Sequence, residues 1–304
     1  MNLIDQLVPT TVMAVARYED IQNRLPTASF PSQSIVREHL GELAEDIDCF
    51  VLDGFGVLNV GEQAVPGAVE RVNKLRTAGK AIRVLTNGAS RPSTVTLAKY
   101  QKWGLEFALS EVISSRDALG RELQAHKAMR WGFAALEDSE LHTLVPDSVL
   151  LADDPAAYEQ CDGFVLLGTG TWNNKRHQLM SKALIKKPRP VMVGNPDLVA
   201  PHPGGLSREP GLYAHALQDD EVTTPQFYGK PFDNAFALVR ETLEGFDPDR
   251  IAMVGDTLHT DILGGAQAGW KTVLVTGHGI LKDLDVEAAI SRSGIRPDYI
   301  VPTT

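Results

Sequence analysis

Short apolar runs alternate with amphipathic segments along two separate parts of the chain. In the first part, an apolar run at 49–52 precedes a helical pattern at 66–78, and a second run at 81–85 precedes a helical pattern at 92–103. A proline opens the first helical segment and a glycine follows it, which is the usual asymmetry of helix ends. Strands that alternate with helices at this spacing predict a parallel sheet with right-handed crossovers.

The same alternation returns near the end of the chain. A helical pattern at 232–243 precedes a buried run at 251–254, and a second helical pattern at 262–268 precedes a run at 271–275. A final apolar run at 299–301 is stopped by a proline, so we expect a short edge strand there. These elements are predicted to share one sheet with the first part.

The block between the two parts has strands and a helix of its own. Its apolar runs are 149–151, 164–167 and 190–193. A helical pattern covers 177–185, and a loop rich in proline and glycine follows at 195–210. This block therefore reads as a second small α/β domain inserted into the first, and the stretch at 201–211 as a hinge back to the core.

The predicted fold class is α/β, with a Rossmann-like doubly wound parallel sheet and an inserted smaller α/β domain. A chain of 304 residues is long for one core and comfortable for two. We expect a core domain formed by 46–124 and 209–304, and an inserted domain at 125–208. Residues 1–45 form an N-terminal extension, whose amphipathic stretch at 13–25 is expected to pack on the body or on a partner subunit.

Composition narrows the class of protein. The formal net charge is -10, whereas a general nucleic-acid binder is usually basic, and the acidic balance also disfavours an anionic membrane surface. Cys49 and Cys161 lie far apart, which favours a reducing compartment over a disulfide framework. Residues 1–17 show no signal-peptide pattern, and no apolar run is long enough to span a bilayer. We expect a cytoplasmic protein that binds neither nucleic acid nor membrane, with a homo-oligomer possible.

Three predicted strands end in residues that can carry chemistry. Asp53 follows the first, Thr86 and Asn87 follow the second, and Asp256 follows the third. In an open parallel sheet, ligands bind beyond the carboxyl ends of the strands. Asp261 lies in the same loop as Asp256, and hard oxygen ligands of this kind suit Mg²⁺.

Each of these residues also has a plain structural explanation. Asp53 and Thr86 are suited to cap a turn or a helix after a strand, and the two aspartates of the later loop are suited to the same task. Lys230 precedes Pro231 at a predicted helix start, where the helix dipole opposes a cation. A solvated surface lysine is nevertheless the ordinary alternative for that residue.

Taken together, the motifs resemble the four motifs of the haloacid-dehalogenase-like superfamily. In chain order they are Asp-Gly-Phe-Gly-Val-Leu at 53–58, Thr-Asn-Gly at 86–88, Gly-Lys-Pro at 229–231 and Gly-Asp-Thr-Leu-His-Thr-Asp at 255–261. The chain is more closely similar to the sugar- and nucleotide-phosphate phosphatases that include the NagD-like and p-nitrophenylphosphatase-like enzymes. Asn195-Pro196-Asp197 matches a motif of the C2-type cap domain of that group, although Asn-Pro also favours a simple turn. The resemblance covers about residue 45 to 280 and is thin across 125–190.

The resemblance implies a Mg²⁺-dependent hydrolase that acts on a phosphorylated small molecule. Asp53 would attack phosphorus and form an aspartyl-phosphate, which divides a difficult hydrolysis into two steps. Thr86 would hydrogen-bond a phosphoryl oxygen, helped by the backbone N–H groups of Asn87 and Gly88. Lys230 would neutralise charge on the nucleophile and on the phosphoryl group.

The resemblance also implies a metal site and a substrate wall. Mg²⁺ would be held by the carboxylates of Asp53 and Asp256 and by the backbone carbonyl of Phe55, because a cation removes the repulsion between two anions that must meet. Asp261 would support the lysine or a metal-bound water. The inserted cap would supply the specificity contacts, for which the candidates are Asn195, Asp197, Trp172, Asn173 and Asn174.

One position departs from the phosphatase pattern. Phosphatases of this superfamily carry a second Asp two residues after the nucleophile, where it protonates the leaving group and then activates water. Here that position is Phe55. Three consequences of Phe55 are open: the substrate has a good leaving group, the phosphoenzyme is long-lived, or another residue supplies the proton. His259 is a candidate for that residue, although a solvated loop histidine is the simpler reading of it.

Two further functions therefore stay open at the level of sequence. An aromatic residue at this place resembles the haloacid dehalogenases, whose halide leaves without a proton, so dehalogenation is one alternative. The other is a pseudoenzyme that binds a phosphorylated ligand without turnover, since binding needs Thr86, Lys230 and the metal but no acid at position 55.

Overall fold

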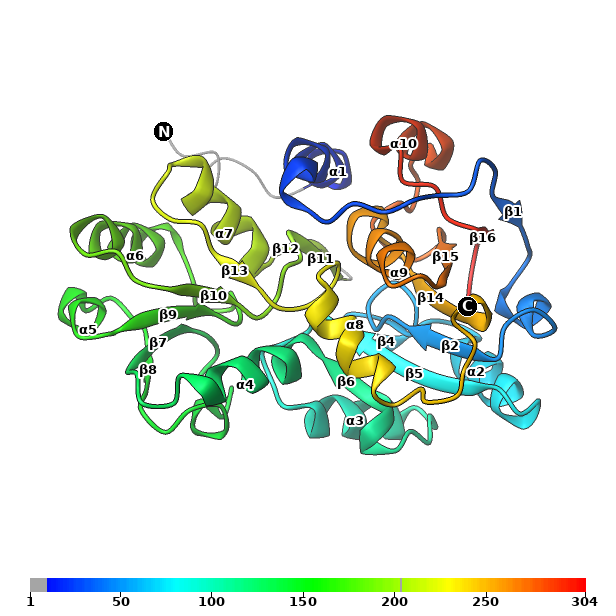
Figure 1. Ribbon diagram of the computed structural model, residues 1–304, viewed down its shortest axis with the longest axis horizontal. Coiled ribbons are helices and arrows are strands. Elements are labelled where there is room, and N and C mark those ends of the chain that lie inside the picture. Colours follow the sequence, from blue (N-terminus) through cyan, green and yellow to red (C-terminus); the bar gives the residue numbers. More distant parts are fainter. Residues whose placement is uncertain (1–9, 203) are drawn as a thin grey trace.

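The computed structural model describes residues 10–202 and 204–304 and contains two parallel sheets, each with helices packed on it (Figure 1). The larger sheet has seven strands in the order β1-β16-β15-β14-β2-β5-β6, and every adjacent pair is parallel. In chain order they are β1 (Ile35–Val36), β2 (Cys49–Leu52), β5 (Ala81–Thr86), β6 (Val112–Ser114), β14 (Ile251–Gly255), β15 (Lys271–Val275) and β16 (Tyr299–Val301). This confirms the predicted parallel core sheet.

The central strand β2 is buried on both faces, which is why its sequence is a continuous apolar run. Phe50 and Leu52 pack on one face in a cluster that includes residues of α2 and α3. Cys49 and Val51 pack on the other face, in a cluster that includes residues of α8. The bounds of these helices are α2 (Ala68–Thr77), α3 (Ser93–Lys102) and α8 (Asp233–Arg240). Helices on both faces make the core doubly wound.

The order of the strands places a switch point beside β2. From β2 the chain proceeds to β5 and β6 on one side, and it returns later to form β14, β15 and β16 on the other side. A crevice at the carboxyl ends of strands forms where the order reverses in this way. Asp53 and Asp256 directly follow the two strands at this point, β2 and β14.

The smaller sheet has five parallel strands in the order β13-β10-β9-β7-β8. Its strands are β7 (Trp131–Ala134), β8 (Ser148–Leu150), β9 (Gly163–Leu166), β10 (Val191–Val193) and β13 (Gln226–Phe227). The helices of this part are α5 (Pro155–Glu159), α6 (Asn174–Lys186) and α7 (Pro210–Asp219), whereas α4 (Ser115–Ala125) contacts β6 and α8 of the core and leads into this part. Because α7 packs on β9 and β10 and β13 pairs with β10, we propose that the inserted domain ends near residue 228 rather than at 208.

Two local expectations were wrong. The segment 195–210 is not a plain loop, because β11 (Val199–His202) pairs antiparallel with β12 (Gly205–Arg208). Gly205 has a φ of +125°, which permits the turn between them. The strand at 299–301 is not at the edge, because β1 pairs with it on the outside, and two residues are too few to be recognised as a strand from sequence.

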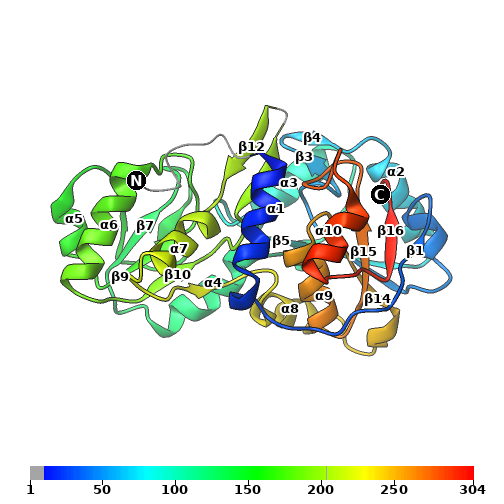
Figure 2. The ribbon, with the colours of Figure 1, turned by 90° about the horizontal axis from the view of Figure 1, so that it is seen from above.

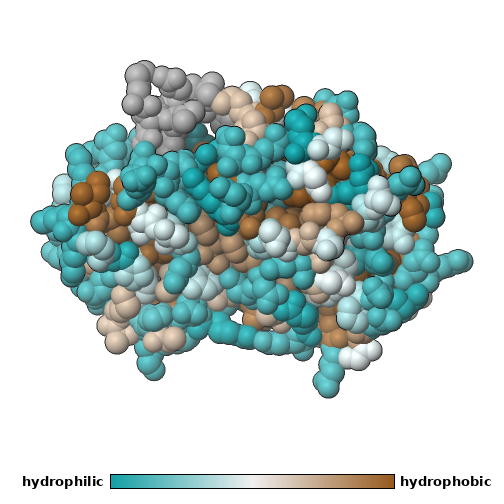
Figure 3. All heavy atoms as spheres, turned by 45° about the horizontal axis from the view of Figure 1, so that its top comes forward, coloured by the Kyte–Doolittle hydropathy of each residue, from teal (hydrophilic) through white to brown (hydrophobic). Residues whose placement is uncertain are grey.

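The remaining elements are short. They are α1 (Thr11–Asp20), the small hairpin of β3 (Asn59–Val60) and β4 (Gln63–Ala64), a π-helical turn at Leu258–Ile262, α9 (Leu263–Gln267) and α10 (Val286–Ser293). Every helix in the two described ranges is too short or too polar to cross a bilayer. The face of the molecule drawn in Figure 3 is mostly hydrophilic, with apolar residues in small separate groups.

Helix α1 of the N-terminal extension lies across the junction of the two parts of the molecule (Figure 2). The Tyr18 hydroxyl accepts a hydrogen bond from the Leu198 backbone N–H at 3.0 Å, and the Tyr18 ring stacks on His259 at 5.3 Å. Just beyond the helix, Arg24 donates to the Asp219 carboxylate at 2.6 Å. Leu198 and Asp219 belong to the inserted part and His259 to the core, so the extension packs on the body and ties both parts together.

Replacing Tyr18 by Ala is expected to lower the free energy of unfolding by about 3–5 kcal/mol, because it removes a fully buried aromatic ring. Tyr18→Phe keeps the ring and loses only the hydroxyl, so we expect a loss of about 1 kcal/mol. Urea unfolding of the three proteins measures the difference. Equal stability of the Ala variant and the unmodified protein would show that the extension does not hold the two parts together.

Candidate active site

Three carboxylates converge at the switch point of the core sheet. One oxygen from each of Asp53, Asp256 and Asp261 lies within 4.8 Å of the others, and all three residues are buried. Asp53 and Asp256 reach this place from the ends of β2 and β14, and Asp261 from the π-helical turn that follows β14. The parallel sheet thus brings together residues that are about two hundred positions apart in the sequence.

Lys230 lies among these carboxylates rather than on the surface. Its Nζ is 2.6 Å from Asp53 Oδ1 and donates to Asp261 Oδ1 at 2.7 Å, and the residue is only 1% exposed. Burial opposes the charge of Lys230, but Asp261, Asp53 and Asp197 together raise its pKa above the ordinary value. Lys230 is therefore a protonated, fully desolvated cation, and the alternative of a solvated lysine is wrong.

One ammonium does not balance three buried carboxylates. Burial raises the pKa of Asp53, against the opposing effect of Lys230, and burial together with the Asp261 charge raises the pKa of Asp256. A second cation among these oxygens would favour the ionised carboxylates. The donors are all hard carboxylate oxygens, so the residues present fit a divalent ion such as Mg²⁺.

The surroundings of Asp256 fix the orientation of its carboxylate. The carboxylate accepts hydrogen bonds from the Ile280 backbone N–H and the Thr257 hydroxyl, both at 2.8 Å. Gly56 has a φ of +78°, and a Cβ placed there would lie 2.5 Å from Asp256 Oδ2. Only glycine therefore permits both this backbone conformation and the close approach of Asp256.

The predicted phosphate-binding segment 86–88 adjoins the carboxylates. Thr86 is buried at the end of β5, and its Oγ1 accepts a hydrogen bond from the Gly88 N–H at 3.1 Å. The side chain of Asn87 makes two contacts with the backbone of Lys230, accepting from its N–H at 2.8 Å and donating to its carbonyl at 3.0 Å. Asn87 therefore positions Lys230 with its side chain, which sequence reasoning did not foresee.

Asn195 and Asp197 bring the inserted part to the same place. Asp197 Oδ1 accepts from Asn87 Nδ2 at 2.8 Å, which is a direct contact between the inserted part and the core. Asn195 accepts from the Asp197 N–H at 3.0 Å and donates to Glu209 at 3.1 Å. Burial raises the pKa of Asp197 to about 8, although Lys230 acts against this. Both residues line the cavity described next.

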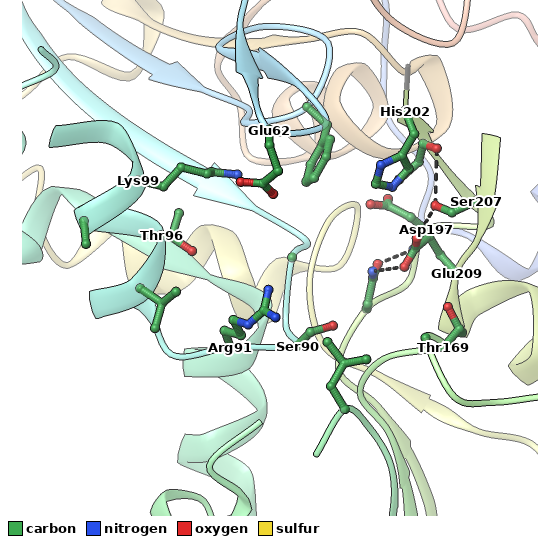
Figure 4. Close-up of a pocket in the computed structure, with 18 of the residues that line it drawn as sticks. Glu62, Ser90, Arg91, Thr96, Lys99, Thr169, Asp197, His202, Ser207 and Glu209 are labelled. Atoms are coloured by element: carbon green, nitrogen blue, oxygen red, sulfur yellow. Dashed lines mark hydrogen bonds between the residues drawn. The ribbon is translucent and has the colours of Figure 1, made fainter. Parts of the chain in front are cut away.

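A cavity of about 620 Å³ lies between the core and the inserted part, and Phe55 lines it (Figure 4). The Phe55 ring is flanked by His202, at 5.9 Å between ring centroids, and by Lys99, whose Nζ is 5.3 Å from the centroid of the Phe55 ring. Sequence reasoning missed both neighbours. A lysine on an amphipathic helix is ordinarily solvated, and His202 stands in a segment that was read as a loop.

Three other sequence-based candidates have structural roles instead. Trp172 is buried in the hydrophobic core of the inserted part, and Asn173 caps α6 by accepting from the Arg176 N–H. His259 is neither solvated nor in the cavity wall, because it is buried against Tyr18, and burial lowers its pKa to about 4. The wall of the cavity described above includes residues of α3 and of the β11–β12 hairpin, but none of residues 172–174.

Comparison with known proteins gives family matches on both parts of the core. The family model for haloacid dehalogenase-like hydrolases matches residues 50–145, and a second model, described as HAD-hydrolase-like, matches 227–304. Human glycerol-3-phosphate phosphatase is 29% identical over 301 residues, covering 87% of this chain and 91% of the relative.

Solved structures give the same result for the whole architecture. A possible sugar phosphatase from Cytophaga hutchinsonii superposes with a TM-score of 0.78 at 24% identity, covering 89% of this chain and 98% of the other. The p-nitrophenyl phosphatase from Archaeoglobus fulgidus superposes with a TM-score of 0.67 at 25% identity, covering 85% and 97%. The chain belongs to the haloacid-dehalogenase-like superfamily, in its NagD- and p-nitrophenylphosphatase-like group of phosphatases with an inserted α/β cap domain.

Proposed function

We propose that the protein hydrolyses a phosphate monoester of a small molecule by transferring the phosphoryl group to Asp53. The observation that carries the proposal is the contact of Asp53 with Lys230 inside a buried cluster of three carboxylates, next to a cavity of substrate size. Attack by Asp53 on phosphorus forms an aspartyl-phosphate and releases the alcohol oxygen, and water then cleaves the acyl-phosphate bond.

The neighbouring groups have complementary tasks in this proposal. Lys230 neutralises charge on Asp53 and on the phosphoryl oxygens, and it is already desolvated and fixed before substrate binds. Thr86 donates its hydroxyl to a phosphoryl oxygen, helped by the N–H groups of Asn87 and Gly88. Asp261 holds Lys230 in place through the 2.7 Å hydrogen bond.

Mg²⁺ is the cation that we propose for this site. Asp53 and Asp256 would hold it with the backbone carbonyl of Phe55, and Asp261 would lie next to it. When bound, such an ion supplies positive charge that removes the repulsion between the nucleophile and the phosphoryl oxygens.

We further infer that Phe55 replaces the second aspartate that phosphatases of this superfamily use as acid and base. A phenyl ring can neither protonate the leaving oxygen nor activate water. Turnover should therefore be fastest when the leaving oxygen is stable as an anion, and hydrolysis of the phosphorylated Asp53 should be slow. His202 is the histidine next to the Phe55 ring, which makes it a better candidate for a substitute proton donor than the buried His259.

We infer the substrate class from the names of the relatives. The relatives act, by name, on glycerol 3-phosphate and on sugar phosphates. A panel of such metabolites, together with p-nitrophenyl phosphate and acetyl phosphate, run with and without Mg²⁺, tests the function. Release of phosphate that depends on Mg²⁺ is expected, and no release from any member of the panel would overturn the proposal.

The same panel separates the other two functions. A haloacid dehalogenase would release halide from a 2-haloacid in the presence of a chelator. A binding protein without turnover would be stabilised by a phosphorylated ligand and release no phosphate. The relatives named as phosphatases and the cluster of three carboxylates, which fits a cation, favour the phosphatase over both.

Addition of Mg²⁺ to the chelator-treated protein is expected to raise its Tm, because the ion binds the folded state only. At a concentration one hundred times the Kd, binding adds about 2.7 kcal/mol of stability. Asp256→Asn should abolish this shift, whereas the exposed Glu244→Gln should keep it. A shift of the same size in the Asp256 variant would mean that the ion binds elsewhere.

The cytoplasmic location stays a proposal. It rests on the two buried cysteines, Cys49 and Cys161, both present as free thiols. The absence of nucleic-acid partners and the possible homo-oligomer likewise remain predictions from the sequence.

A further inference from the structure

Lys99 is a half-buried cation at the wall of the active-site cavity (Figure 4). Three aromatic rings surround its Nζ at 5.3–5.8 Å from their centroids, and they belong to Phe55, Tyr100 and Trp103. Within the described ranges, Lys99 makes no ion pair within 4.0 Å and no hydrogen bond. The ammonium therefore faces the cavity with its hydrogen-bonding capacity unused.

An ammonium in this position loses part of its hydration without forming an ion pair in return. Burial lowers the pKa of Lys99, while the nearby Glu62 acts in the opposite direction without forming an ion pair. Glu62 is exposed and also lines the cavity. Other lysines of the chain, such as Lys74 and Lys80, form direct ion pairs with carboxylates. Lys99 is thus available to an anion that enters the cavity.

The basic residues of the cavity lie on the wall of α3, where Figure 4 shows Glu62 beside Lys99, and two further acids, Asp197 and Glu209, lie on the opposite wall. Three basic residues line the wall formed by α3 and the segment before it, namely Arg91, Lys99 and Lys102. Arg91 is already paired with Asp138. The acids of the opposite wall, Asp197 and Glu209, already accept hydrogen bonds from protein groups, and burial raises their pKa values to about 8 and about 7. The wall of α3 is the one suited to an anion.

We propose that Lys99 binds a second anionic group of the substrate, a carboxylate or a second phosphate, so that the natural substrate is a phosphate monoester of an already anionic small molecule. This proposal rests on the phosphoryl site at Asp53 and Lys230 described above. Phe55 lies two residues after Asp53 and contacts Lys99, so the second group would lie beside the Phe55 ring. An aspartate at position 55 would neutralise Lys99 and repel the second anion, whereas a phenyl ring does neither.

The test compares 3-phosphoglycerate with glycerol 3-phosphate, which carry a carboxylate and a neutral CH₂OH group, respectively, at the end away from the phosphate. We expect the intact protein to prefer 3-phosphoglycerate in kcat/KM by about tenfold or more, the size of one charge-assisted hydrogen bond. Lys99→Met should abolish the preference by raising KM for 3-phosphoglycerate. Activity on glycerol 3-phosphate and p-nitrophenyl phosphate should change by less than about twofold, as should all activities of the exposed control Lys127→Met.

Two outcomes would overturn the proposal: no preference in the intact protein, or an equal loss on both substrates in the Lys99 variant. A binding measurement separates this failure from failure of the proposed hydrolysis. Phosphonoacetate should raise the Tm of the intact protein more than methylphosphonate does, and the difference should disappear in Lys99→Met. If no substrate releases phosphate but this difference in Tm is observed, the proposed hydrolysis is wrong and the anion site at Lys99 is supported. If the difference in Tm is absent, the anion site is wrong.

Discussion

Asp53→Asn is expected to reduce phosphate release by at least about 10⁴-fold, because loss of a nucleophile has effects of this order or larger. An amide has the shape of the carboxylate but cannot form the acyl-phosphate. In the structure Lys230 Nζ lies 2.6 Å from the Asp53 carboxylate, and Asp53 directly follows β2. Release of phosphate from acetyl phosphate in the presence of Mg²⁺ measures the loss.

The substitution should leave the fold intact. Lys230 retains its hydrogen bond to Asp261, and the change removes one of three mutually repelling carboxylates, so the Tm should be unchanged or higher. Asp46→Asn, on the exposed segment before the same strand, is the matched control and should keep full activity. Activity of the Asp53 variant above about a tenth of normal would place the nucleophile elsewhere, because a tenfold loss corresponds to only about 1.4 kcal/mol.

Phe55→Asp is expected to raise turnover of phosphate esters with poor leaving groups by about 10²–10⁴-fold, the usual contribution of a general acid and base. The new carboxyl group would protonate the leaving alcohol and then activate water against the phosphorylated Asp53. For glycerol 3-phosphate, the rate of phosphoryl transfer to Asp53 should increase most. For p-nitrophenyl phosphate, whose leaving group needs no proton, only the hydrolysis of the phosphorylated Asp53 should become faster. Steady-state and burst kinetics on both substrates measure the two contributions.

Phe55→Leu and Phe55→Asn are the matched controls, since one keeps an apolar side chain and the other adds polarity without an acid. Neither should gain activity. A gain in all three variants would mean that the phenyl ring merely obstructs the cavity, and no gain in the aspartate variant would mean that position 55 does not face the leaving group. The aspartate variant should also lose the preference for anionic substrates, because its carboxylate would pair with Lys99.

The parts of the site that could be predicted from sequence all follow from the parallel sheet. Asp53, Thr86 and Asp256 end short buried runs, and strands that run in parallel must bring their ends to one edge. The motif at 229–231 predicted Lys230 as a site residue. Its burial between two carboxylates explains why a cation next to a helix start is tolerated.

The parts that could not be predicted depend on contacts between distant segments. Lys99 lies on an ordinary amphipathic helix, and only the packing of α3 beside Phe55 makes it a cavity residue. The β11–β12 hairpin depends on pairing that its proline- and glycine-rich sequence conceals, and it carries His202 to the Phe55 ring. The role of Tyr18 likewise needs both domains in place, because its partners lie more than 170 positions away in sequence.

Mass spectrometry of the protein quenched in acid during turnover of acetyl phosphate tests the central claim most directly. Without an acid–base residue at position 55 the phosphoenzyme should accumulate, so a large fraction of the protein should carry one added phosphoryl group, and peptide mapping should place it on Asp53. Phosphate release without any labelled protein, or a label on a residue other than Asp53, would contradict the account.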